Sequence, residues 1–176
     1  MADVAEIAPP PAVDQLGNIT IWWVPTIADT LAVKASTELG AATSFRVTYS
    51  FLSGGFPVDS TQAKNTDERL GLLDVLESLG AITTSFGDGI EYVDSTTPGS
   101  AAVVLKPTAP ATSKSGYFVV RPNLPQATLA AAAQVGTVYP VTLGKPRRGT
   151  VDGQGKFRWK QQVVLTAPPV ETIFAA

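Results

Sequence analysis

Glycine and proline divide this chain into short β-type segments, and that division constrains its fold more than any other feature. The 176 residues include 15 glycines and 14 prolines, and the apolar-leaning stretches are only about eight residues long, too short to cross a bilayer. Short apolar segments between turn residues are typical of strands. We therefore expect a mainly β fold, a β-sandwich or barrel of roughly seven or eight strands with one or two short helices.

Alternation and β-branched or aromatic content indicate where the strands lie. The clearest amphipathic strand is 44–52, where aromatic and apolar side chains alternate with polar ones. Pro140 falls inside another expected strand and indicates a sheet edge or a bulge. Neighbouring side chains of a strand face opposite ways, so we expect one of Trp22 and Trp23 in the core and the other in an interface. The expected strands are 18–24, 44–52, 81–86, 90–93, 116–121, 137–144 and 156–166.

The segments between these strands are harder to assign. Residues 53–67 form a long polar stretch, and loops of this length are usually functional or ordered by a partner. The leucine spacing over 67–79 matches a helix face that ends before Gly80. Leucines two residues apart in the same segment also suit one face of a strand. Local signals favour the helix. Shorter helical segments are expected at 98–105 and 128–133.

The chain reads as one domain with extended ends. Residues 1–17 contain a triple proline and no helix or strand period, which indicates a flexible N-terminal arm. Residues 18–166 form the single β domain, and 167–176 form a C-terminal tail. The first residues carry no signal-peptide pattern, so we expect synthesis in a cytoplasm.

Composition argues against catalysis. The chain has no histidine and no cysteine, which excludes imidazole and thiolate metal sites, disulfides, and nucleophiles of the Ser-His-Asp and Cys-His kinds. The spacing of Glu77, Asp88 and Glu91 does not require a carboxylate pair for hydrolysis. Asp88, Glu91 and Asp94 could bind calcium weakly, but they lack the EF-hand spacing. We therefore expect a binding or structural protein, not an enzyme, with no cofactor and no metal.

The formal net charge of -2 hides an uneven distribution. Up to Asp94 the chain carries 13 acidic and four basic residues, and from Ser95 onward it carries two acidic and nine basic ones. Six of those bases lie between Lys145 and Lys160. Three interpretations remain open. The basic cluster is a solvated hairpin, or it binds nucleic acid, which the acidic half of the chain would oppose. Alternatively, unlike patches attract copies head to tail and build rings or filaments.

Four groups of sequence blocks carry a family resemblance through their order along the chain. They are Thr37–Gly40 with Phe45–Tyr49 and Ser53–Phe56; Thr66–Leu70 with Glu77 and Gly80; Gly116–Arg121 with Val138–Val141; and Gly155–Gln161. In this order they resemble the major tail tube proteins of long, non-contractile-tailed (siphovirus-like) bacteriophages, particularly those that infect actinobacteria.

The resemblance implies a tail-tube-type β-sandwich with one short flanking helix, a long inter-subunit loop and extended termini. Such proteins form rings, typically hexameric, that stack into the tube through which the genome passes to the host. The implied partners are other copies, the tape measure protein, the tail terminator and distal tail proteins, and double-stranded DNA that passes without specific binding. The implied location is the virion tail, assembled in the host cytoplasm without membrane insertion. The resemblance also favours an extended segment over a helix at 68–79.

Candidate contact residues follow from the resemblance and from charge. The arm 1–17, the loop 53–67 and the tail 167–176 match segments that reach neighbouring subunits. Candidate contacts between subunits or rings are Phe56, Asp59, Asp67, Arg69, Lys145, Arg147 and Arg148. An acidic lumen would repel DNA, and the candidates that face it are Asp74, Glu77, Asp88 and Glu91, with Glu68 placed at the lumen or a ring interface. Two alternatives remain: a tail terminator or neck ring protein, and a non-viral β-sandwich adhesion or binding module.

Overall fold

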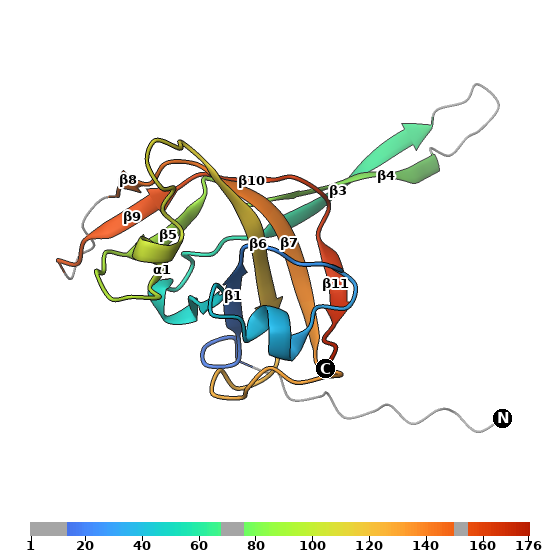
Figure 1. Ribbon diagram of the computed structural model, residues 1–176. Coiled ribbons are helices and arrows are strands. Elements are labelled where there is room, and N and C mark those ends of the chain that lie inside the picture. The colour runs from blue at the N-terminus through green and yellow to red at the C-terminus, as the bar shows by residue number, and fades with distance from the viewer. Residues whose placement is uncertain (1–13, 68–75, 150–154) are drawn as a thin grey trace.

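Antiparallel strands make up most of the regular structure in the computed structural model, which describes residues 14–67, 76–149 and 155–176. Strands account for 41% of the chain and helices for 8%, so the mainly β expectation is confirmed. A six-stranded sheet in the order β10-β7-β6-β1-β2, with β11 also paired to β7, forms the body (Figure 1). Its strands are β1 (Thr20–Val24), β2 (Phe45–Arg46), β6 (Lys114–Arg121), β7 (Val135–Leu143), β10 (Val163–Leu165) and β11 (Val170–Ile173).

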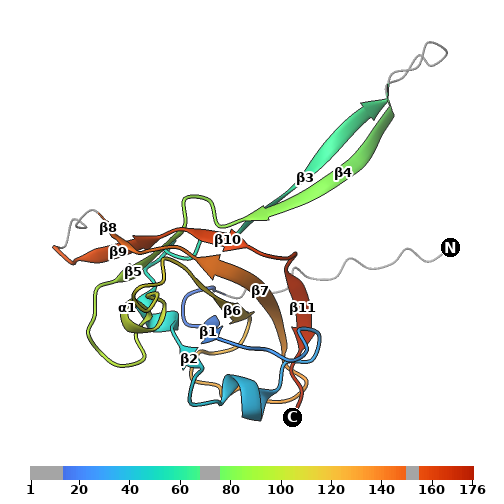
Figure 2. The ribbon, with the colours of Figure 1, turned by 45° about the horizontal axis from the view of Figure 1, so that its top comes forward.

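Two smaller sheets accompany the body, and the described sheets do not close into a barrel. One is β5 (Ile90–Val93), β9 (Arg158–Gln161) and β8 (Arg147–Arg148), with β9 in the middle. The other is a long hairpin of β3 (Asp59–Asp67) and β4 (Leu76–Ser85), which extends away from the body in both views (Figures 1 and 2). The helices are short: η1 (Ala35–Leu39), η2 (Thr48–Ser50) and α1 (Ala101–Val104), the last inside the expected 98–105 segment.

The central sheet is buried on both faces. All five residues of β1 are buried, and its tryptophans point into two different cores. Trp23 packs edge-on against Phe118, with 5.2 Å between ring centroids, in the core beneath α1 and β5. Trp22 packs against Phe174 at 6.0 Å in a second core that Leu39 of η1 helps to close. The expectation that one tryptophan lies in an interface is wrong, because η1 and the C-terminal residues cover the second face within the same chain.

A buried polar network joins the small sheet to the body. The amide of Gln161 on β9 donates to the carbonyl oxygens of Leu105 and Gly144, at 3.1 and 2.6 Å. Its Oε1 accepts a hydrogen bond from the Tyr92 hydroxyl at 2.9 Å. Burial raises the pKa of Tyr92, and nearby Asp94 raises that pKa further, so the hydroxyl remains a donor at physiological pH. Every polar atom of the Gln161 side chain thus has a partner, as a buried amide requires.

Arg121 fixes the loop that follows β6. Its guanidinium is fully buried and donates to the carbonyl oxygens of Pro125, Thr128 and Leu129. The helical turn expected at 128–133 does not form, since those residues adopt bends and turns. Instead, the loop is tied to Arg121 through the carbonyl oxygens of Thr128 and Leu129, and Ala133 at its end has a left-handed φ of 66°, which a helix does not allow.

The predicted strand 44–52 is wrong beyond its first residues. Only Phe45 and Arg46 pair with β1, after which the chain turns through η2 and leaves Tyr49 84% exposed. The hydroxyl of Thr48 accepts a hydrogen bond from the Ile21 amide at 2.8 Å. This side-chain acceptor takes the place of a ladder carbonyl, so pairing ends there.

Pro140 does not mark a sheet edge, because β7 pairs with β6 on one side and with β10 and β11 on the other. β10 ends opposite Val141 and β11 begins opposite Val138, so Pro140 faces the break between them. No described neighbouring strand requires an amide hydrogen at residue 140, so proline is tolerated there. The Pro140 carbonyl still accepts a hydrogen bond from the Thr166 amide.

The last expected strand divides between two sheets, and the C-terminal segment continues the body. The segment 156–166 bends at Gln162, placing β9 in the small sheet and β10 in the large one. Within 167–176, expected as a tail, β11 pairs with β7. Of the expected N-terminal arm, only 14–17 lies among the described residues.

The hairpin replaces three sequence assignments. Part of the expected loop 53–67 is strand β3, and β4 includes most of the expected strand 81–86. The helix that local signals favoured over 67–79 is wrong at 76–79, which is extended as the family resemblance implied. Residues 68–75 lie outside the described residues.

Gly116 provides a stability test of the body. A Cβ at this position would lie 2.5 Å from the ring of Trp23, which is packed and cannot move aside. We expect Gly116→Ala to lower the free energy of unfolding of the unassembled protein by about 1–3 kcal/mol, the cost of overpacking. The matched control is Gly144→Ala, whose Cβ would meet its nearest atom at 3.7 Å and should change stability by less than about 1 kcal/mol. Equal urea midpoints for the two variants would contradict this packing.

Candidate assembly surfaces

The hairpin carries several of the candidate contact residues. Asp59 begins β3 opposite Ser85, and Asp67 ends it opposite Leu76. Glu77 on β4 lies next to the tip and forms an exposed ion pair with Lys64, with 3.0 Å between Nζ and Oε2. The other candidates from this part of the sequence, Glu68, Arg69 and Asp74, lie outside the described residues.

The hairpin lacks the support that the rest of the chain has. Within the described residues β3 pairs only with β4, so both outer edges of the ribbon are open. Large apolar side chains on β4 are exposed, Leu79 at 74% and Ile82 at 67%. An isolated two-stranded ribbon is marginally stable in water, and open edges with exposed apolar groups are suited to pairing with another chain. The hairpin is therefore the first candidate assembly surface.

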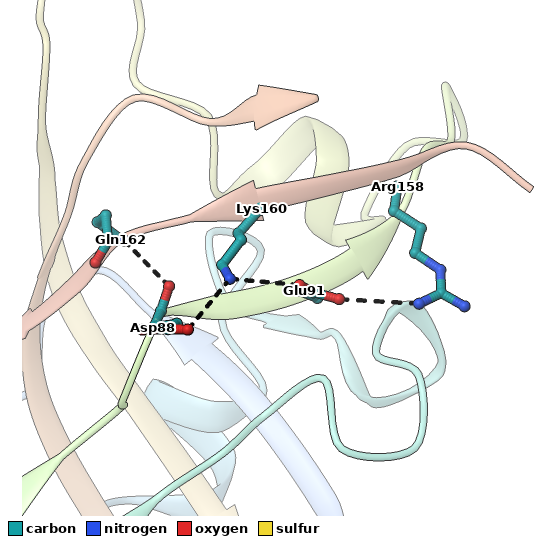
Figure 3. A network of polar contacts seen from close by, with 5 residues as sticks. All are labelled: Asp88, Glu91, Arg158, Lys160 and Gln162. Atoms are coloured by element: carbon teal, nitrogen blue, oxygen red, sulfur yellow. Dashed lines mark hydrogen bonds and ion pairs between the residues drawn. The ribbon is translucent and has the colours of Figure 1, made fainter. Parts of the chain in front are cut away.

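A ladder of opposite charges crosses the small sheet (Figure 3). Lys160 on β9 lies directly across from Glu91 on β5. Its Nζ is 3.7 Å from Glu91 Oε1 and 3.8 Å from Asp88 Oδ2. Arg158 approaches the other oxygen of Glu91 at 3.9 Å, and Gln162 donates to the Asp88 carbonyl. The structure thus brings together Asp88 and Glu91, two candidates for the lumen, and gives both a basic partner within the chain.

A second charge cluster lies at the edge of the same sheet. Arg148 on β8 forms a 3.5 Å ion pair with Asp94 and lies over the ring of Trp159. The indole of Trp159 donates to Asp94 at 2.8 Å, which closes the cluster. Lys145 and Arg147, the other basic candidates here, are exposed.

These contacts change the meaning of the charge split. Asp88, Glu91 and Asp94 pair with Lys160, Arg158 and Arg148 on the small sheet, so part of the opposite charge is paired inside each subunit. Exposed ion pairs of this kind contribute little to stability, typically less than about 1 kcal/mol each. The charge available for attraction between copies is correspondingly smaller than the sequence counts indicate.

Phe56 belongs mainly to the core of its own subunit. Its ring lies 5.2 Å from those of Phe51, Phe86 and Phe118, in edge-to-face arrangements. The ring is only half-buried, and its open side faces a groove of about 830 Å³ at the root of the hairpin. As a contact between subunits, Phe56 could act only through this groove.

The groove was not predicted from the sequence. It is lined by segments 15–21, 48–58 and 125–127 together with Val120 and Tyr139, and no charged side chain lies among its described lining residues. Tyr49 stands at its side, and its hydroxyl donates to Gln126 Oε1 at 2.8 Å. The one local signal was Tyr49, and its place on the aromatic and apolar face of the expected strand 44–52 concealed it. An uncharged, partly aromatic groove suits an apolar protein segment.

The described residues offer binding surfaces and no evident chemistry. No group of three or more potential metal ligands occurs among them. None of their helices is long and apolar enough to span a bilayer. The described part of the chain is a β domain whose projecting ribbon and uncharged groove are available for contact with other proteins.

Comparison with known proteins gives the family. A family model described as phage tail tube protein matches residues 8–176. The chain therefore belongs to the phage tail tube proteins, and it is a structural component of a phage tail. This confirms the resemblance drawn from the sequence blocks, while the actinobacteriophage type stays a prediction. Comparisons with curated proteins and with solved structures give no match.

The charge ladder can be separated from assembly by two substitutions that each remove one positive charge. We expect Lys160→Gln to lower the free energy of unfolding by no more than about 1 kcal/mol, because its ion pairs are partly exposed. Lys145→Gln, at an exposed candidate contact, should leave unfolding unchanged and raise the concentration needed for assembly. Urea unfolding and sedimentation of the two variants make the comparison. A lower free energy of unfolding in Lys145→Gln would instead place this residue in a contact within the subunit.

Proposed function

We propose that this chain self-assembles into stacked rings, hexameric in the family's usual arrangement, that form the tail tube and conduct the genome into the host cell. The observation that carries the proposal is the hairpin β3–β4. It projects from a body whose cores are filled by its own side chains, and it leaves Leu79 and Ile82 exposed to solvent. A subunit with its own cores needs no partner to fold, whereas the ribbon needs one to be covered. Membership in the tail tube family supports the proposal that the assembly is a tail tube.

The proposal includes the surroundings of the tube. The chain acts as a non-enzymatic structural protein, synthesised and assembled in the bacterial host cytoplasm. It contacts other copies, the tape measure protein, the tail terminator and the distal tail proteins. Double-stranded DNA passes through without specific binding.

The site assignments remain part of this proposal. The contacts between copies are Phe56, Asp59, Asp67, Arg69, Lys145, Arg147 and Arg148, and the lumen-facing residues are Asp74, Glu77, Asp88 and Glu91. Asp88 and Glu91 are matched by Lys160 and Arg158. A lumen formed by this part of the surface would be near neutral, which also suits a conduit that must not bind DNA.

Electron microscopy of the purified full chain tests the proposal. We expect long tubes with a central channel in negative stain. Single rings that do not stack would indicate a tail terminator or neck protein instead. Monodisperse monomers at all concentrations would contradict self-assembly.

Ionic strength tests which forces hold the tube. Because many charges are paired inside each subunit, we expect the concentration needed for assembly to change by less than about tenfold between roughly 0.05 and 0.5 M salt. Light scattering across a salt series measures this. Dissociation of tubes at high salt would instead make attraction between the acidic and basic surfaces the dominant contact.

A further inference from the structure

An irregularity in the hairpin decides which side chains share a face. Gln62 lies opposite Ile82 and Lys64 lies opposite Leu79. The pairing therefore advances two residues along β3 and three along β4, so β4 contains one extra residue in a β-bulge. Gln62 and Lys64 lie on one face because strand side chains alternate. Their partners Ile82 and Leu79 consequently share that face, whereas a regular strand would place them on opposite faces.

The bulge thus creates an exposed apolar pair. Its polar neighbours on the same face are already engaged, since Lys64 pairs with Glu77 at 3.0 Å and Gln62 donates to the Gly80 carbonyl at 3.3 Å. Leu79 and Ile82 are therefore the apolar part of this face, and the Lys64–Glu77 pair beside them has no net charge. We name the side chains of Leu79 and Ile82 the bulge face.

The reach of the hairpin places the bulge face beyond its own subunit. Ile82 pairs with Gln62, which is three residues along β3 from Asp59. Leu79 pairs with Lys64, which is five residues along. At about 3.3 Å per residue these positions lie about 10 and 17 Å from the root. The ribbon points away from the body (Figure 2), so it cannot fold back onto the groove at its own root while it stays paired. The distance suits a subunit placed directly alongside.

The groove provides a matching surface. Pro57 and Val58 line it immediately before β3 begins, and its described lining includes no charged side chain. An apolar pair that enters such a groove desolvates no charged side chain of the groove's described lining, whereas burial of the ion ladder on the small sheet would desolvate charges. Every copy carries both the bulge face and the groove, and they are different surfaces. A contact between them is heterologous, the kind that generates rings and filaments.

We propose that the bulge face of one copy docks in the groove of a neighbouring copy, with Ile82 and Leu79 packed beside Tyr49 and Phe56. This inference rests on the proposed self-assembly and specifies the surfaces that form it. The bulge in β4 sets the contact, because it is the feature that brings the two apolar side chains to one face.

Cysteine cross-linking tests the contact, and the natural chain has no cysteine to interfere. Two single variants, Ile82→Cys and Tyr49→Cys, are mixed before assembly and then oxidised. We expect a cross-linked dimer of the two variants on a denaturing gel, in at least about tenfold greater yield than with the control mixture of Thr83→Cys and Tyr49→Cys. Thr83 is exposed on the opposite face of β4. Similar yields from both mixtures, or a cross-link in Ile82→Cys alone, would overturn the proposal.

A charge substitution gives an independent test. Leu79→Lys places a cation in the uncharged groove, and we expect it to raise the concentration needed for assembly by at least about tenfold. Thr61→Lys, exposed on the opposite face, should assemble like the natural chain, and thermal unfolding should be the same for both monomers. Equal effects on assembly would overturn the proposal. If the natural chain forms tubes but no selective cross-link appears, only this inference fails; if it forms no tubes, the proposed function fails.

Discussion

The burial of β1 and its neighbours on both faces is the constraint on which the rest of the structure depends. Trp23 and Phe118 fill one core, and Trp22 and Phe174 fill the other. Because η1 and the C-terminal residues close the second core from within the chain, the subunit needs no partner to complete its interior. The hydrophobic effect, the main favourable term in folding, is largely satisfied inside one copy.

The hairpin is the exception, and that contrast is the basis of the proposed assembly. Its strands are paired only to each other among the described residues, and its large apolar side chains lie in solvent. In the proposed assembly, the body folds within one copy and the ribbon is covered only when copies join. The groove at the root of the ribbon gives each copy a second surface, so that one copy can both donate and receive a contact.

The sequence predicted the elements whose signal is local. The segments at 18–24, 90–93 and 116–121 became strands because β-branched and aromatic residues fit a buried sheet. The 44–52 strand failed because one hydroxyl, that of Thr48, ended the pairing, which alternation cannot reveal. The bulge in β4 was likewise invisible, since it depends on register between strands. The family was identified from the order of blocks rather than from any site. The ion pairs that reduce the apparent charge split join residues far apart in the sequence, so the sequence alone could not reveal them.

The most direct measurement is an electron cryomicroscopy map of the assembled protein at a resolution that separates strands. We predict that the β3–β4 hairpin crosses from its own subunit to a neighbour, with Leu79 and Ile82 covered by the groove beside Tyr49. A map in which the hairpin folds against its own body, or stays uncovered in the tube wall, would contradict the view that this ribbon holds the assembly together.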